Sequence, residues 1–448
     1  MSELLPLLRI AGPVILAEVG WMSMGIVDTI MVGPLGPAAI GAAGMGSSLF
    51  TAIAIFGMGL MLGLDTFVSQ AYGANDSTSC RQWLHSGVWL ALLVTPFVMG
   101  LAWLLWLTLE WWGLHPQIRP LVSDYLWVIS FGALPLLLYA ALRRYLQGMH
   151  VVRPIMFALI SANLVNAGAN WVLIYGHLGM PALGVEGSAW STTLARIYMA
   201  LFLYVAIVIE HRRRREHIHV SLAPDAPRLR RLVSLGFPAA SQVALEVGVF
   251  AAATALAGRL EPVSSGSHQI ALNIASLAFM VPLGLSSSGA VRVGHAIGGG
   301  DLRRAVRAGW TALATGGVVM TVIGLVLFAW PAALIGAFTT DPRIIEIGVG
   351  LLAIAAAFQL FDGTQAVATG VLRGVGETRM PMMVNIVGHW MFGLPVGYAL
   401  CFHYAWGVAG LWIGLSIGLV FTAVVLVGVW WKKTRVMQNA KCKMRNET

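Results

Sequence analysis

The sequence predicts an all-α integral membrane protein whose twelve transmembrane helices are shared between two pseudo-symmetric halves. Of its 448 residues, 58% are hydrophobic and only 10% are charged, whereas a soluble domain carries about 25% charged residues. The chain also repeats itself at a constant offset, and its basic residues are concentrated on alternate connections between apolar segments. These three observations indicate a membrane protein, two related halves and an orientation.

Twelve apolar segments result when the chain is divided at charged positions and at Pro- or Gly-rich positions. Each can form a helix of about 20 residues, the length that crosses a bilayer. The first half has segments at residues 8–33, 39–68, 83–108, 120–145, 153–176 and 184–209. The second half has segments at residues 231–257, 265–292, 307–330, 343–371, 381–402 and 406–431. The first segment lacks a small-residue cleavage site, so we expect it to remain as a span.

An internal repeat relates the two halves. Residues 7–76 align without a gap with residues 232–301, an offset of 225 positions that places Pro13 opposite Pro238. Two similar halves in a bilayer usually form two lobes with a site between or within them, which suits alternating access. The repeat therefore predicts a transporter.

The distribution of positive charge predicts the orientation. With the N-terminus inside, 24 of the 28 Lys and Arg residues fall on the cytoplasmic side, including both tails. The outer side has Arg119, Arg259 and Arg343, and Arg196 lies inside a span. This asymmetry predicts that both termini are cytoplasmic, and it accounts for the net charge of +9 without a nucleic-acid partner.

The domain organisation follows from the longest inner connection, which is rich in Arg and contains two prolines. We expect an N-lobe of six helices over residues 1–209 and a basic cytoplasmic linker over residues 210–230. A C-lobe of six helices over residues 231–431 and a basic cytoplasmic tail over residues 432–448 complete the prediction.

Polar residues inside the first half indicate a first candidate ion site. Asp28 lies in the outer half of the first span, and Asn163, Asn166 and Asn170 share one face of the fifth. A carboxylate with carboxamide oxygens suits a small hard cation or a proton. The alternative is a hydrogen-bonded cluster that joins two helices, because Asn commonly does this in membranes.

The second half has its own acidic residues at mid-membrane depth. Glu246 lies in the seventh span, and Asp362 lies in the tenth with Gln359 and Gln365 on a similar face. Two carboxylates at this depth repel each other unless a cation or proton neutralises them, which is the chemistry of an ion-coupled carrier. The alternative is that each acid pairs with a nearby Arg or Gln.

Three further residues are candidates for lining a substrate cavity, namely Glu18, Gln359 and His389. Glu18 either lines the cavity or makes hydrogen bonds at a helix interface, and Arg196 either pairs with Glu18 or extends toward the membrane surface. His389 lies well inside the eleventh span, where it is a proton-relay candidate or a packing residue. We expect a structural role for Asp65, near the inner end of the second span.

The sequence contains no motif for soluble catalysis. It has no P-loop, no H-E-x-x-H and no nucleophile elbow, and its three cysteines lack metal-ligand spacing. We therefore expect neither an enzyme, nor a structural metal site, nor a cofactor. Transport energy must then come from an ion gradient rather than from ATP hydrolysed by this chain.

These residues resemble the MATE (multidrug and toxic compound extrusion) family, closest to its NorM-type branch, over about residues 8–430. The matching segments are Gly12-Pro13-Val14 and Val27-Asp28-Thr29 in the first span, Ser69-Gln70-Ala71-Tyr72-Gly73 after the second, Asn166 and Asn170 in the fifth, Leu245-Glu246-Val247 in the seventh, His268-Gln269-Ile270 in the eighth, and Asp362 with Gln365 in the tenth. Several motifs in order, in both halves, make the resemblance specific.

The resemblance implies two six-helix lobes around a central cavity, and export of organic cations and hydrophobic drugs in exchange for Na⁺ or H⁺. By similarity, Glu246, Asp362 and Gln365 occupy the C-lobe cation site, and Asp28, Asn166 and Asn170 occupy the N-lobe site. The chain departs from the family pattern twice: some relatives have a second carboxylate in place of Asn170, and we expect Gln in place of Glu18 in NorM-type relatives.

Our interpretation is an ion-coupled antiporter in a bacterial-type inner membrane, functional as a monomer, that exports cationic or amphipathic compounds. The alternative is a related flippase-type carrier of a lipid-linked or metabolite cargo. Such flippases tend to have extra spans and more cationic cavities, whereas the charge excess within these spans is acidic. A passive channel would not need buried titratable acids in both halves.

Overall fold

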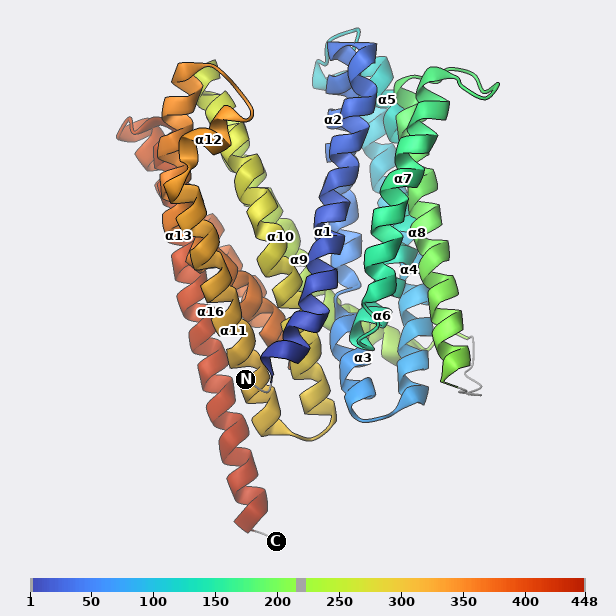
Figure 1. Cartoon of the computed structure of the whole chain (residues 1–448), viewed down its shortest axis with the longest axis vertical. Coiled ribbons are helices and arrows are strands. Elements are labelled where there is room, and N and C mark those ends of the chain that lie inside the picture. Colours follow the sequence, from blue (N-terminus) through green and yellow to red (C-terminus); the bar gives the residue numbers. More distant parts are fainter. Residues whose placement is uncertain (1–2, 215–222, 447–448) are drawn as a thin grey trace. The chain divides into compact units, whose positions relative to one another are not determined.

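The computed structural model describes residues 3–214 and 223–446, with side chains to residue 439. Long helices joined by short connections make up this described part (Figure 1). Eleven of its helices are long and apolar enough to cross a membrane, and a bent pair of shorter helices brings the number to twelve when the pair is counted as one span. This confirms the prediction of an all-α membrane protein with twelve spans.

The helices of the first half follow the predicted segments closely. They are α1 (Leu4–Val32), α2 (Pro37–Leu60), α3 (Gly63–Gly73), α4 (Ser77–Thr108), α5 (Arg119–Phe131), α6 (Ala133–Gly148), α7 (Arg153–Tyr175) and α8 (Val185–Arg213). The short 3₁₀ helices η1 (Gly33–Leu35) and η2 (Leu109–Trp112) end the first and third spans.

The helices of the second half repeat this order, with one long helix in place of α2 and α3 and another in place of α5 and α6. They are α9 (Ala226–Ala257), α10 (Pro262–Gly298), α11 (Leu302–Ala329), α12 (Pro331–Gly336), α13 (Pro342–Gly374), α14 (Arg379–Asn385), α15 (Leu394–Tyr398) and α16 (Gly407–Asn446). Two π-helical segments, η3 (Ile386–Gly393) and η4 (Ala399–His403), alternate with α14 and α15 in the eleventh span.

The chain forms two compact units whose limits differ from those of the predicted lobes. Unit 1 contains Met1–Ile15 and Ser241–Thr448, and unit 2 contains Leu16–Ala240. Each limit falls two residues after a helix-interior proline, Pro13 or Pro238. The first turns of α1 and of α9 are therefore exchanged between the units, at positions 225 residues apart as in the sequence repeat.

The predicted linker and tail are more helical than expected. Helix α8 continues to Arg213 and α9 already begins at Ala226, so the separate connection is shorter than residues 210–230. Residues 215–222 lie outside the described part. The predicted tail, residues 432–448, begins as the end of α16 rather than as a separate segment.

The fourth span is broken into α5 and α6, which meet at 46°. Pro135 lies in the first turn of α6. In a continuous helix its ring would clash with the carbonyl of the residue four positions earlier, and it has no N–H to donate to that carbonyl. At the break, a Cβ on Gly132 would lie 2.8 Å from a guanidinium nitrogen of Arg196. The bend and the absent side chain make room for a buried arginine.

Close helix packing depends on small residues, as is usual in membranes. In unit 2 a Cβ on Gly187 of α8 would lie 2.6 Å from the Leu173 backbone of α7. In unit 1 a Cβ on Gly414 of α16 would lie 2.2 Å from the Gly397 nitrogen of α15. Any larger residue at either position would force these helices apart.

The start of α4 and the start of α11 carry the same cap, 225 residues apart. The carboxylate of Asp76 accepts from the Ser79 amide at 2.9 Å, and that of Asp301 accepts from the Arg304 amide at 3.0 Å. Hydrogen bonds from Ser79 lower the pKa of Asp76. The repeat therefore preserves helix starts as well as apolar segments.

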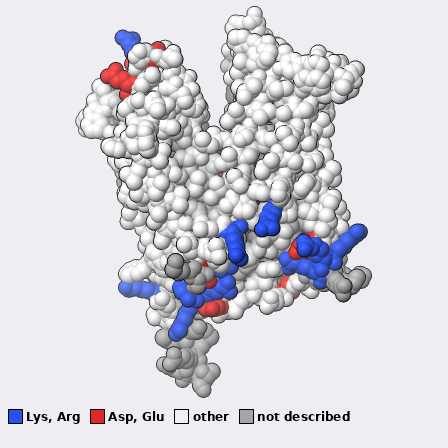
Figure 2. All heavy atoms as spheres, viewed as in Figure 1, with Lys and Arg blue, Asp and Glu red and all other residues white. Residues whose placement is uncertain are grey.

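Charged side chains are rare over most of one face of the molecule (Figure 2). On the face seen in Figure 2 most atoms belong to uncharged residues, and Lys and Arg lie mainly toward one end of each unit. This placement is expected of helices that cross a bilayer and end in a polar interface.

Candidate functional site

Unit 2 contains a hydrogen-bonded acidic site built from α1, α7 and α8. Asn166 and Asn170 donate to Asp28 Oδ1 at 3.0 and 2.8 Å, and Thr192 donates to Asp28 Oδ2 at 2.9 Å. Asn166 and Asn170 are fully buried and one helical turn apart on α7. The structure thus brings together all three predicted residues of the first half.

Two further hydrogen bonds hold α1 against α7 on either side of this site. Asn163 Nδ2 donates to the Gly20 carbonyl at 2.9 Å, and the Tyr175 hydroxyl donates to the Met31 carbonyl at 2.5 Å. The Asn side chains predicted to share one face therefore serve two purposes. Asn163 joins the helices through the backbone, and its two neighbours hold the carboxylate of Asp28.

The surroundings of Asp28 include one positive charge and one free acceptor. Arg196 on α8 is buried, lies over the Phe50 ring at 4.7 Å, and interacts electrostatically with Asp28. The buried oxygen Oδ1 of Asn170 has no hydrogen-bond partner. Arg196 therefore neither pairs with Glu18 nor extends to the membrane surface, which were the two roles considered for it.

Unit 1 contains the second acidic site, built from α9 and α13. Gln365 Nε2 donates to Glu246 Oε1 at 2.6 Å, and Gln242 Nε2 donates to Glu246 Oε2 at 3.2 Å. Asp362 is buried one turn before Gln365 and interacts electrostatically with Glu246. The structure thus brings Glu246, Asp362 and Gln365 together, as predicted.

Negative charge at this second site has no positive partner in the described part of the chain. Neither Glu246 nor Asp362 forms an ion pair there, and the donors to Glu246 are neutral amides. A buried charge without a partner is costly, so these carboxylates need a proton or a cation. Oxygen Oε1 of Gln365 is buried without a hydrogen bond and is available as a further ligand.

Gln359 and His389, two of the cavity candidates, are buried inside unit 1. Both are 0% exposed, and neither the amide of Gln359 nor the two ring nitrogens of His389 have hydrogen-bond partners. Asn385, one turn before His389, is in the same situation. They provide polar atoms within the fold, and a role in a substrate cavity stays a prediction.

Glu18, the third cavity candidate, is engaged in a buried ion pair with Arg143 of α6. Asp65 is likewise buried and pairs with Arg144 at 3.3 Å. Both arginines belong to α6, which brings them against α1 and α3, and neither pairing was predicted from the sequence. The interface role of Glu18 is therefore the one that the geometry favours.

Two hydrogen-bond donors at these sites, Gln242 and Thr192, were not predicted from the sequence. Gln242 lies four residues before Glu246 on the same helix, so their contact was available from helical spacing alone. Thr192 gave no such signal, because it reaches Asp28 from a helix 164 positions away in the chain.

Comparisons of the sequence identify related proteins along nearly the whole chain. The family model described as MatE matches residues 13–172 and 238–399. The "Probable multidrug resistance protein NorM" of Mesorhizobium japonicum is 36% identical over 97% of this chain and 95% of that protein. The "Multidrug resistance protein NorM" of Burkholderia vietnamiensis is 35% identical over 95% of this chain and 93% of that protein.

Comparisons of the fold agree with those of the sequence. A crystal structure of the eukaryotic MATE transporter AtDTX14 has a TM-score of 0.88 at 21% identity, covering 98% of this chain and 99% of that chain. A MOP superfamily transporter from Pyrococcus furiosus, described as having a binding pocket of reverse polarity, has a TM-score of 0.86 at 18% identity, covering 97% and 96%. At these identities the structures support the fold alone.

Proposed function

This chain belongs to the MATE family of membrane transporters, and on that premise we propose that it is an ion-coupled multidrug efflux antiporter. It exports cationic and amphipathic organic compounds by alternating access, in exchange for Na⁺ or H⁺. Its relatives are named multidrug resistance proteins, which supports drugs as the cargo. Transport leaves the cargo chemically unchanged. The proposed cycle therefore involves the bilayer, the cargo and the coupling ion, and no cofactor.

The observation that carries this proposal is the pair of carboxylates in unit 1. Glu246 and Asp362 lie in the interior, interact electrostatically, and have no Lys or Arg partner in the described part of the chain. A cation or proton bound there offsets their repulsion, and its release makes the site unfavourable again. Such a site exchanges an ion during each transport cycle, as an antiporter requires.

The site in unit 2 supports a second role. Protonated Asp28 has an acceptor within its own cluster, because Asn170 Oδ1 is buried and unpaired. We propose that protonation exchanges donor and acceptor roles within this cluster and changes how α1 is held against α7. In this proposal Asp28 adjusts cargo release, whereas the acids of unit 1 bind the coupling ion.

The proposal includes a location in the bacterial inner membrane with both termini cytoplasmic, supported by the positive-inside distribution. Single cysteines replacing the exposed residues Met180 and Arg213 test it, in a background without native cysteines. An impermeant thiol reagent should label position 180 only from outside and position 213 only from inside. Labelling of both from one side would contradict the topology.

Efflux from proteoliposomes tests the transport proposal directly. The purified chain should release a fluorescent organic cation when a Na⁺ gradient or an H⁺ gradient is imposed separately, and one of these should be sufficient. The gradient that drives efflux identifies the coupling ion. Equal efflux with neither gradient would indicate passive movement and would refute antiport.

A further inference from the structure

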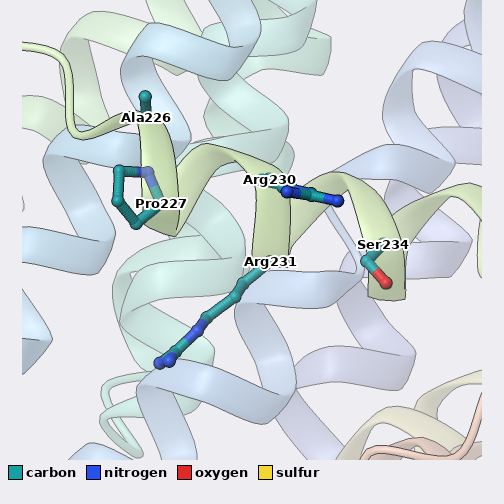
Figure 3. Close-up of a pocket in the computed structure, with 5 residues that line it drawn as sticks. All are labelled: Ala226, Pro227, Arg230, Arg231 and Ser234. Atoms are coloured by element: carbon teal, nitrogen blue, oxygen red, sulfur yellow. The ribbon is translucent and has the colours of Figure 1, made fainter.

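A pocket lies beside the start of α9, and none of its lining residues belongs to the two acidic sites. Its volume is about 520 Å³, and it is lined by Ala226, Pro227, Arg230, Arg231 and Ser234 (Figure 3). All five residues lie along the first turns of one helix and belong to unit 2. Two of the five carry positive charge.

The arginines at this end of α9 are used in two different ways. Arg228 is engaged within unit 2, since it pairs with Asp225 at 2.9 Å and lies over the Trp83 ring at 5.0 Å. Arg230 and Arg231 are exposed and form no ion pair with another described residue. Their side chains leave the helix in different directions (Figure 3), so the pocket presents two charges that nothing described neutralises.

The length of α9 places this pocket at the level of the lipid headgroups. The helix has 32 residues, which at about 1.5 Å per residue is longer than the hydrocarbon core of about 30 Å. About one third of the helix must therefore lie outside the core. Arg228, Arg230 and Arg231 all lie at the N-terminal end of α9. Because arginine is costly within hydrocarbon, this end is the part that lies outside the core.

Apolar side chains continue the same face of α9 toward the hydrocarbon. Arg230, Ser234 and Phe237 follow one another at spacings of four and three residues and so share a face. Phe237 and the neighbouring Val233 are 52% and 40% exposed. The surface thus combines positive charge at the headgroup level with exposed apolar groups deeper in the membrane.

We propose that this pocket binds an anionic phospholipid, with Arg230 and Arg231 around the phosphate and an acyl chain along Val233 and Phe237. Guanidinium groups offer several N–H donors in a geometry that suits phosphate oxygens. Basic pockets beside transmembrane helices recognise anionic headgroups. A zwitterionic lipid has the same phosphate, but its ammonium group opposes binding next to two arginines.

Native mass spectrometry of the full-length protein in detergent tests this site with phosphatidylglycerol and phosphatidylcholine of identical acyl chains. The wild type should retain phosphatidylglycerol in preference. Arg230→Gln and Arg231→Gln should each weaken its binding by about fivefold, and the double variant should remove the preference. Arg303→Gln with Arg307→Gln is the matched control, because these arginines are exposed on α11 and do not line the pocket.

Two further measurements separate a pocket from diffuse attraction and a lipid from a free anion. Ser234→Trp fills the pocket and keeps both charges, so it should weaken phosphatidylglycerol binding, whereas Arg230→Lys with Arg231→Lys should retain most of it. Inorganic phosphate should not displace the lipid. Equal loss in the α11 control, unchanged binding in Ser234→Trp, or displacement by phosphate would each overturn the proposal.

Discussion

The two buried acidic sites differ in how their negative charge is balanced. In unit 2, Asp28 is alone, accepts hydrogen bonds from Asn166, Asn170 and Thr192, and interacts with the positive charge of Arg196. In unit 1, Glu246 and Asp362 interact with each other, and Glu246 receives only amide hydrogen bonds. The two halves of one repeat have thus placed acids in opposite electrostatic surroundings.

This difference favours different roles for the two sites in the transport cycle. A site that already contains its balancing charge can remain unoccupied at low cost, whereas two acids without a cation favour a proton or cation strongly. We therefore expect the coupling ion to bind in unit 1, and we expect Asp28 to modify the cycle.

The largest effect should come from the acids of unit 1. Removing one unit charge about 4 Å from a bound cation costs about 4 kcal/mol at intermediate dielectric, so ion affinity should fall roughly a thousandfold. Asp362→Asn and Glu246→Gln should therefore reduce ion-driven efflux to the level of empty proteoliposomes, with normal membrane insertion. Glu346→Gln, an exposed acid at the start of α13, is the control. Wild-type efflux in both variants would move the coupling site to unit 2.

The next largest effect should be on the stability of the protein, at the buried ion pair between Glu18 and Arg143. Arg143→Gln leaves Glu18 buried without its partner, which should lower the free energy of unfolding by about 3 kcal/mol. Adding Glu18→Gln to this variant should restore much of the loss, because the uncompensated charge is then removed. Thermal unfolding in detergent measures both variants. A double variant as unstable as Arg143→Gln would show that packing rather than charge dominates.

A smaller effect is expected at Asp28. Asp28→Asn removes a negative charge and weakens the three hydrogen bonds that hold this side chain, so the affinity for a cationic cargo should fall by about tenfold. The variant resembles the protonated state, and the pH dependence of cargo release should become flatter. Binding of a fluorescent cation across a pH series measures both quantities, with the exposed Asp124→Asn as control. An unchanged pH profile would show that Asp28 only joins helices and does not affect cargo release.

The smallest effect should occur at an acid outside the spans. Glu377 pairs with Lys433 at 2.9 Å; burial acts to raise the pKa of Glu377, but hydrogen bonds from Lys433 and nearby amides lower it overall, below its usual 4.5. The ionised form is therefore stabilised by folding, and this contribution is present above the unfolded pKa and lost as the pH falls through the folded one.

Glu377→Gln measures this contribution. At neutral pH it should cost about 0.5 kcal/mol, and its difference from the wild type in thermal unfolding should shrink on acidification. A difference that grows toward low pH would show that folding does not stabilise the ionised form of Glu377.

Much of the fold was predictable because the relevant signals are local. Apolar length locates a span, and the repeat at 225 positions predicts that each half has the same elements, down to the caps at Asp76 and Asp301. The spacing of Asn166 and Asn170 predicts a shared face, and mid-span Asp28, Glu246 and Asp362 stand out because charge is costly there. These conclusions required no knowledge of which helices are neighbours.

Pairing between distant helices could not be predicted in the same way. From the sequence, Arg196 was one candidate partner for Glu18, but the fold brings Arg143 to Glu18 and leaves Arg196 beside Phe50 near Asp28. The π-helical segments of the eleventh span were also invisible, because one extra residue in a turn does not alter an apolar segment.

The sequence by itself therefore determined the membrane class, the spans, the repeat and the acids, since each depends on hydrophobicity or on spacing within one helix. Only the tertiary structure decided how charge is balanced, because this depends on distances between helices. The exchange of the first turns of α1 and α9 between the units illustrates the same limit. Pro13 and Pro238 are visible in the sequence, but which neighbours the turns before them contact is set by packing alone.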